Sequence, residues 1–125
     1  MKTALTVFFA LFALLSCSND NDIIRPACGV DNPAKELSWL KTEIDNREAN
    51  ITEDTKYCYI TQADYKGQTV FVYQDCNPLI DKGIPILDCE GNWIDRTEEN
   101  RFALRDLENQ IIIWRPALFV CEPEL

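Results

Sequence analysis

The chain has 125 residues, of which 46% are hydrophobic and 26% charged, and its formal net charge at pH 7 is −9. This length suits one domain with a modest core, and the apolar fraction is typical of a chain that folds. The acidic excess argues against a nucleic-acid partner and against binding to anionic lipid headgroups, because both need clustered lysine and arginine.

The amino terminus has the pattern of a secretory signal peptide. Lys2 precedes an apolar run over residues 4–15, which is too short to cross a bilayer because a spanning helix needs about 20 residues. The run ends in Leu-Leu-Ser followed by Cys17, an ending that resembles a bacterial lipobox. This resemblance implies that the signal peptide, residues 1–16, is removed and that Cys17 receives palmitate-type acyl chains that anchor the protein in a membrane. Ordinary secretion, with a cut after Ser18, is the alternative.

The segment after the signal peptide is polar and shows no sustained period, so residues 17–27 are predicted to form the lipidated cysteine and a flexible tether. A single globular domain then covers residues 28–125. Ser18, rather than aspartate, follows Cys17, and by the enterobacterial sorting pattern this resemblance implies the cell outer membrane. Asp20 and Asp22 resemble the acidic export signals of Bacteroidota surface lipoproteins, so a periplasmic and a surface-facing orientation both stay open.

The first predicted element of the domain is a long helix over residues 33–48. Asn32 is a good N-cap and Pro33 suits the first helical position, where its missing N–H costs nothing. Three apolar residues recur at helical spacing and are expected to dock on a sheet: Leu37, Leu40 and Ile44.

A β-hairpin is predicted next. Residues 57–61 and 69–73 are rich in β-branched and aromatic residues, and Lys66-Gly67 between them suits a two-residue turn. That turn places one set of residues on one face of the hairpin: Tyr57, Tyr59, Val70 and Val72. The opposite face then carries a second set: Cys58, Ile60, Phe71 and Tyr73. Both faces are apolar, so one packs on the helix, and the tyrosine–valine face is either covered by a second layer or is a candidate partner face.

Three further segments are predicted to be extended, at residues 84–87, 93–94 and 111–114, with a short second helix over residues 97–107 before the last strand. The fold class is therefore α+β, with an antiparallel sheet of about four to five strands and both helices on one face.

Five cysteines remain when Cys17 is set aside, and in an exported chain they are expected to form disulfides. Cys58 and Cys76 point to opposite faces of the hairpin. A strand at residues 84–87 running back beside the second hairpin strand places Cys89 far from Cys76. Of the three pairings that four cysteines allow, we favour Cys28 with Cys89 and Cys76 with Cys121, which leaves Cys58 as a buried thiol outside any disulfide.

Several segments together resemble a group of small Bacteroidota lipoproteins: Cys28-Gly29-Val30-Asp31-Asn32-Pro33, Leu37-Ser38-Trp39-Leu40, Tyr65-Lys66-Gly67, Asp88-Cys89-Glu90-Gly91-Asn92 and Ile113-Trp114. The resemblance supports the predicted α+β fold and the location in the cell envelope, and it implies no catalytic residue.

The composition offers little for catalysis. The chain has no histidine, no Cys-x-x-Cys pair and no glycine-rich phosphate loop, so we expect no metal, no cofactor and no histidine-dependent nucleophile. The leading hypothesis is a non-catalytic, membrane-anchored envelope lipoprotein that binds a protein or glycan partner. One alternative is a carboxylate-based hydrolase that uses Asp88, Glu90 and Asp95. Another is a disulfide-braced protease inhibitor with an exposed loop between Asp75 and Pro85.

Tryptophans could stack sugar rings in a glycan-binding protein. The chain has three of them, Trp39, Trp93 and Trp114, and each lies in a periodic apolar context. Core packing is therefore the favoured interpretation for all three.

Overall fold

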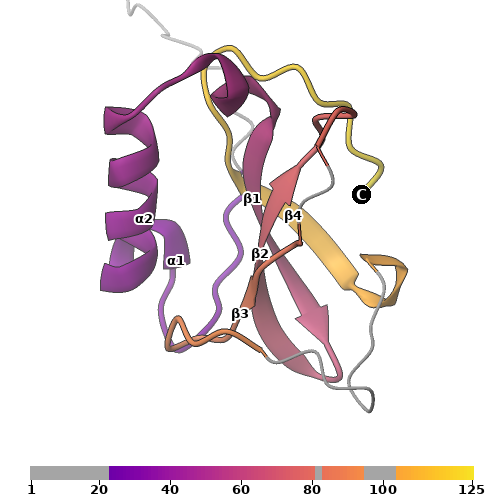
Figure 1. The fold of residues 1–125 in the computed structure, drawn as a ribbon. Coiled ribbons are helices and arrows are strands. Elements are labelled where there is room, and N and C mark those ends of the chain that lie inside the picture. The colour runs from indigo at the N-terminus through magenta and orange to yellow at the C-terminus, as the bar shows by residue number, and fades with distance from the viewer. Residues whose placement is uncertain (1–22, 81–82, 95–103) are drawn as a thin grey trace, which may run out of the picture.

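The computed structural model describes residues 23–80, 83–94 and 104–125 (Figure 1). Two helices lie on one side of a four-stranded antiparallel sheet of order β3-β2-β1-β4, which confirms the α+β class. The helices and strands are α1 (Pro33–Glu36), α2 (Ser38–Ala49), β1 (Cys58–Tyr65), β2 (Gln68–Asp75), β3 (Ile86–Leu87) and β4 (Glu108–Trp114), with short 3₁₀ helices at Glu53–Tyr57 and Leu104–Asp106.

Two predicted segments fall outside the described residues. They are the signal peptide with Cys17 and most of the tether, and residues 95–103, which make up most of the predicted second helix. Within the described part of the chain, no helix has the length and apolar character needed to cross a membrane.

The prediction of one helix over residues 33–48 is wrong, because the chain forms two helices there. Leu37 has an extended backbone (φ −80°, ψ 110°) that ends α1 and precedes α2. The predicted docking stripe is nevertheless confirmed: Leu40 is fully buried, and Leu37 and Ile44 pack against the same core. The apolar spacing is identical with or without the break, so periodicity could not reveal it.

The predicted hairpin is confirmed residue by residue. Cys58 pairs with Asp75 and Tyr65 with Gln68, which leaves a two-residue turn. Lys66 (φ 48°) and Gly67 (φ 75°) both adopt positive φ, as the type I′ turn of a tight hairpin requires. β3 pairs antiparallel with β2, as expected for residues 84–87.

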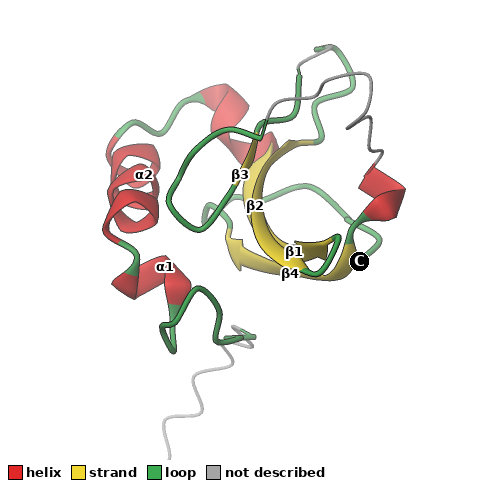
Figure 2. Cartoon of the chain, turned by 90° about the horizontal axis from the view of Figure 1, so that it is seen from below, coloured by secondary structure: helices red, strands yellow, loops and turns green. Residues whose placement is uncertain are grey.

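The sheet carries a hydrophobic cluster on each face. Between the sheet and the helices lie Leu40, Ile60, Phe71 and Trp114. On the other face lie Ala63, Val70, Val72 and Ile86, with partly buried side chains from flanking loops packed against them. In Figure 1 the yellow C-terminal segment passes over the sheet and ends on the side away from α2, and Figure 2 shows how strongly the sheet curves between these layers.

The prediction that the tyrosine–valine face is a partner face is wrong. Tyr59 is 8% exposed, Val70 1% and Val72 0%, while Tyr57 is half-buried. The chain covers this face itself, and Phe119 of the C-terminal segment packs edge-on against Tyr59 at a centroid distance of 5.3 Å. Both faces were apolar because the domain has two packed layers around one sheet.

Both favoured disulfides are present. Cys28 and Cys89 have a Cα separation of 5.5 Å, and Cys76 and Cys121 one of 6.0 Å. Cys58 takes part in neither bridge. Its thiol is half-buried, not buried as predicted, and lies 3.8 Å from the Asp75 carboxylate. The reason is that Cys58 is the first residue of β1 and lies at the end of the strand, not at its centre.

Candidate binding groove

A groove of about 690 Å³ lies along β4. Residues 110–117 and Phe119 line it, together with three side chains from elsewhere: Ile23, Glu48 and Leu125. The groove therefore joins the last strand, the end of α2 and both ends of the described chain.

β4 lies at the edge of the sheet. It pairs with β1 on one side, and among the described residues no strand pairs with its other side (Figure 2). An unpaired strand edge presents a row of backbone N–H and C=O groups that another extended chain can use. The groove thus combines backbone hydrogen-bonding capacity with walls of mixed polar and apolar character.

The register between β1 and β4 shifts near Trp114. Ile60 pairs with Trp114, whereas the next residue, Thr61, pairs with Ile112. This irregularity turns Trp114 into the helix-side core, where its indole N–H donates to Glu48 at 3.2 Å. Ile113 is the extra residue between the two pairs, and such bulges re-aim side chains at strand edges.

Three consecutive isoleucines, residues 111–113, line the groove and are half-buried. At the rim, Ile23 is 63% exposed and Leu125 59% exposed. The lining residues are mostly apolar, but polar atoms make up more than half of the exposed surface of the groove.

The C-terminal wall of the groove is held in place by four kinds of contact. Phe119 packs on Tyr59, the Val120 N–H donates to the Lys56 carbonyl at 3.1 Å, and Cys121 is bonded to Cys76. The Cys121 sulfur also lies 3.3 Å from the Tyr57 carbonyl oxygen. These contacts join the wall to β1, to the segment that precedes it and to the residue that follows β2.

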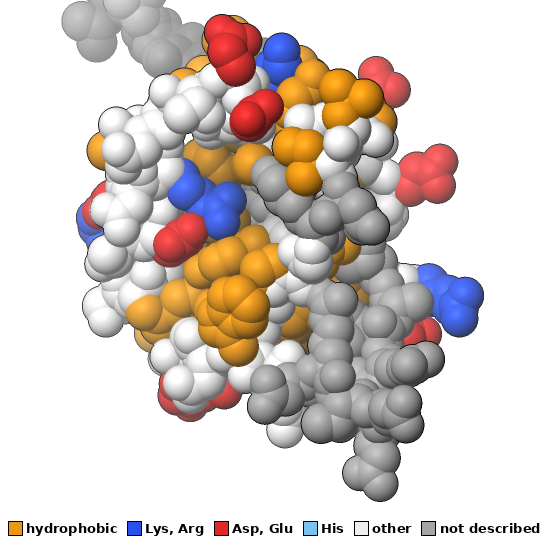
Figure 3. All heavy atoms as spheres, in the orientation of Figure 1, with side chains coloured by type: hydrophobic (Ala, Val, Ile, Leu, Met, Phe, Trp, Pro, Cys, Tyr) orange, Lys and Arg blue, Asp and Glu red, His pale blue; other side chains and the backbone are white. Residues whose placement is uncertain are grey.

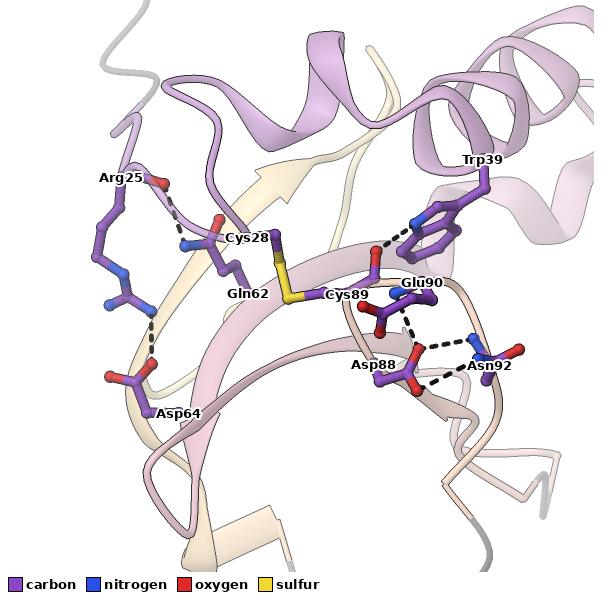
Figure 4. Close-up of a disulfide and its surroundings, with 9 residues drawn as sticks. All are labelled: Arg25, Cys28, Trp39, Gln62, Asp64, Asp88, Cys89, Glu90 and Asn92. Carbon is purple, nitrogen blue, oxygen red and sulfur yellow. Dashed lines mark hydrogen bonds and ion pairs between the residues drawn. A yellow bond between two sulfur atoms is a disulfide. The ribbon is translucent and has the colours of Figure 1, made fainter.

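The N-terminal wall is fixed through Arg25 (Figure 4). Its guanidinium lies 3.7 Å from the Asp64 carboxylate and donates a hydrogen bond to the Asn109 carbonyl. Its own carbonyl accepts from the Gln62 side chain at 3.1 Å. Ile23, two residues earlier, is thereby placed at the groove.

A buried polar network behind the groove was missed by sequence reasoning. The Gln110 side-chain carbonyl accepts hydrogen bonds from Thr61 and Gln74, each at 3.0 Å. Thr61 is fully buried and Gln74 is 6% exposed. Polar residues alternating with apolar ones in β1 and β2 were the available signal, but it is also typical of a solvent-exposed face.

A second cluster lies between α2 and the sheet, around Arg47. The guanidinium carbon lies 4.5 Å from the Tyr73 ring centre and 5.6 Å from that of Trp114, and Nε donates to Glu43 at 2.7 Å. Burial, followed by the nearby Glu43 carboxylate, raises the pKa of Tyr73 to about 12. Two cavities of about 230 and 250 Å³ flank Arg47 and Cys58.

The contacts of Arg47 in this region connect helix and sheet. Figure 3 shows the same side of the molecule, with hydrophobic side chains gathered between the helix and the strands beside a few charged groups.

Two of the three candidate catalytic carboxylates, Asp88 and Glu90, lie among the described residues. Asp88 Oδ1 accepts from the backbone N–H groups of Glu90 at 3.0 Å and Asn92 at 2.9 Å, which fixes the turn beside the Cys28–Cys89 bridge (Figure 4). Glu90 is exposed, and Asp95 lies outside the described residues. Nowhere in the described ranges do three or more Asp, Glu or Cys side chains gather as a metal site would require.

The tryptophans occupy three different environments. Trp114 is buried, and Trp39 donates from its indole N–H to the Cys89 carbonyl at 2.8 Å (Figure 4). Trp93 is 70% exposed, so the prediction of core packing is wrong for this residue. Its backbone forms an isolated antiparallel β-bridge with Leu87.

Comparisons of the chain with known protein families, with curated proteins and with solved structures gave no match.

Proposed function

We propose that the chain is a non-catalytic envelope lipoprotein, anchored through Cys17 in the outer membrane, that binds a protein partner in the groove along β4. The observation that carries this proposal is the groove beside β4, a strand whose outer edge pairs with no described strand. A binding protein needs a contact surface on a stable scaffold, and two disulfides and two hydrophobic clusters support such a scaffold.

A protein partner fits this groove better than a glycan does. Strand edges recognise peptide backbones by hydrogen bonding, whereas sugar rings are recognised by exposed aromatic faces. Trp114, the only tryptophan that lines the groove, is buried at 7% exposure and packs into the core. Asp88, one of the three carboxylates named for a hydrolase, uses its carboxylate to hold a turn.

One observation favours the inhibitor as a second candidate. Leu79 is 91% exposed and follows Cys76, which the disulfide to Cys121 fixes in place. However, the Asn77 side chain accepts a hydrogen bond from the Leu79 N–H, which curls the loop, whereas a protease cleft needs an extended segment. Inhibition by wild-type protein that is lost in Leu79→Ala would support this second candidate.

The anchor is tested by mass spectrometry of the mature amino terminus and by fractionation of producing cells. We expect an acylated terminus at Cys17 and loss of membrane attachment in Cys17→Ser. An unmodified terminus beginning at Asn19 would contradict the anchor.

Partner binding is tested by quantitative capture from solubilised cell envelopes. Ala117→Arg places a long charged side chain in the groove, and Thr42→Arg makes the same change at an exposed position of α2. A protein captured by the wild type and by Thr42→Arg, but lost with Ala117→Arg, supports the proposal. Equal capture by both variants would contradict a role for the groove.

A further inference from the structure

We propose that a small cavity between α1 and the sheet binds an aliphatic alcohol group, held by a hydrogen bond to the side-chain oxygen of Gln62. This inference goes beyond the proposed function, because it assigns a ligand class to a second cavity beside the groove. It is carried by the cavity, by a buried acceptor on a residue of its wall, and by the charge of its lining.

The cavity has a volume of about 90 Å³. Its walls are formed by residues 23–25, by residues 32–35 at the start of α1, and by Gln62, Ile112 and Ile113 of the sheet. Most of these lining residues are apolar. A cavity that holds one water molecule needs roughly 10 to 15 Å³, so this one has room for a ligand of several heavy atoms.

Gln62 supplies the buried acceptor. Its side chain is fully buried, and its Nε2 donates to the Arg25 carbonyl at 3.1 Å. This bond determines the orientation of the carboxamide, and Figure 4 shows its oxygen turned away from the Arg25 carbonyl. None of the described residues donates a hydrogen bond to this oxygen. A buried acceptor without a donor costs free energy, so a ligand that donates to Gln62 Oε1 is favoured in the cavity.

The charge of the lining selects a neutral donor. Arg25 and Lys35 both line the cavity, and within the described ranges no aspartate or glutamate does so. A cationic ligand would therefore meet like charge, which opposes binding. An anion has no hydrogen to donate to Gln62. The ligand that fits both observations is neutral and carries a hydrogen-bond donor.

Among neutral donors, a hydroxyl fits this cavity better than an amide. A hydroxyl donates and accepts through a single atom, so the rest of a short alcohol can contact the apolar walls. An amide brings a separate carbonyl oxygen, which is unfavourable in an apolar site when no donor pairs with it. The ligand class is therefore a short aliphatic alcohol.

The alcohol group has two sources of the same chemistry. One is a free small molecule. The other is a serine or threonine side chain of the partner in the groove, because Ile23, Ile112 and Ile113 line both the groove and the cavity. Only this second source rests on the proposed function.

Three probes with the same carbon skeleton test the inference on the full chain by NMR titration: 2-propanol, acetone and isopropylammonium. We expect 2-propanol to shift the side-chain amide signals of Gln62 and the methyl signals of Ile112 and Ile113 in a saturable way. Acetone cannot donate and should bind about fivefold more weakly, the factor that corresponds to one hydrogen bond of about 1 kcal/mol. Isopropylammonium should also bind more weakly than 2-propanol, because it carries a positive charge. The methyl signals of Ile51, which is 57% exposed and does not line the cavity, should not shift.

Two alanine variants provide a matched pair. Ala34→Leu places a larger side chain in the cavity, whereas Ala49→Leu makes the same change at an exposed position at the end of α2. Ala34→Leu should abolish the shifts, and Ala49→Leu should retain them. Gln62→Met removes the acceptor at similar size, so 2-propanol and acetone should bind this variant equally. If Gln62→Met does not fold, the comparison of the three probes on the wild type still decides the question.

Several results would overturn the inference. They are equal affinity of the wild type for 2-propanol and acetone, tighter binding of isopropylammonium, and shifts that persist in Ala34→Leu. Shifts of equal size at Ile51 would indicate a general solvent effect, and the lack of any saturable shift would indicate that the cavity holds water only; both refute the site.

Quantitative capture from solubilised envelopes then identifies the source of the alcohol group. A partner retained by Ala49→Leu but lost with Ala34→Leu indicates a serine or threonine of that partner, and equal capture by both variants indicates a free alcohol. Capture of no partner at all would count against the proposed function, whereas saturable binding of 2-propanol at Gln62 would still support the cavity as an alcohol site.

Discussion

Removing the Cys76–Cys121 disulfide should both destabilise the domain and release one wall of the groove. The bridge closes a loop between residues 45 positions apart. The entropy that this closure removes from the unfolded chain corresponds to about 4 kcal/mol at 25 °C. Cys76 is exposed and Cys121 half-buried, so replacement by serine adds little loss of packing. The expected cost is a large share of the roughly 5 to 15 kcal/mol that stabilises a domain of this size.

The second disulfide provides a matched control. Cys28 and Cys89 are 61 positions apart, so Cys28→Ser with Cys89→Ser should cost about the same, roughly 4 kcal/mol. The two double variants should differ in the groove. Only loss of the Cys76–Cys121 bridge detaches Cys121 from the rim of the sheet, which leaves Phe119 and Val120 to hold the wall.

Urea unfolding under non-reducing conditions measures the stability, and hydrogen exchange over residues 115–121 reports on the wall. We expect similar losses of stability, with faster exchange of residues 115–121 only in Cys76→Ser with Cys121→Ser. A loss below about 1 kcal/mol would show that the bridge does not constrain the unfolded chain. Equal exchange in both variants would show that packing alone holds the wall.

Three other changes test the fold. Leu40→Ala should cost about 2 to 5 kcal/mol in urea unfolding, because the residue is fully buried between helix and sheet; a cost below about 0.5 kcal/mol would place it outside the core. The pKa of Tyr73 is raised to about 12, so stability should fall as pH rises from 10 to 12, where the unfolded chain loses a proton that the folded state keeps. Tyr73→Phe should lessen this fall, and an unchanged pH profile would contradict the assignment. Gly91→Ala should be clearly destabilising, because its φ is +81° and a Cβ would lie 2.7 Å from the Trp39 ring, whereas Gly83→Ala meets no atom within 4 Å; equal thermal midpoints would refute this reasoning.

Local rules predicted the hairpin well, and they excluded one of the three possible disulfide pairings without deciding between the other two. The two-residue turn at Lys66-Gly67 determines the register by itself, and the register determines which cysteines face each other. This register excluded a disulfide between Cys58 and Cys76. The antiparallel third strand excluded a disulfide between Cys76 and Cys89, because it places the two residues far apart.

The candidate site was predicted poorly, because its features depend on tertiary arrangement. Residues 111–113 were recognised as a strand, but nothing in three consecutive isoleucines indicates whether that strand is central or at an edge. The tyrosine–valine face was ambiguous for a similar reason: an apolar face can be covered by a partner or by the protein's own chain. Here Phe119, far away in sequence, covers Tyr59.

The central claim is that a partner lies in the groove beside β4, and site-specific photo-cross-linking in producing cells tests it most directly. A photoreactive residue is placed at Ala117, in the groove, and separately at Thr42, exposed on α2. We expect an adduct with one envelope protein at position 117 alone. Equal adducts at both positions, or none at position 117, would contradict it.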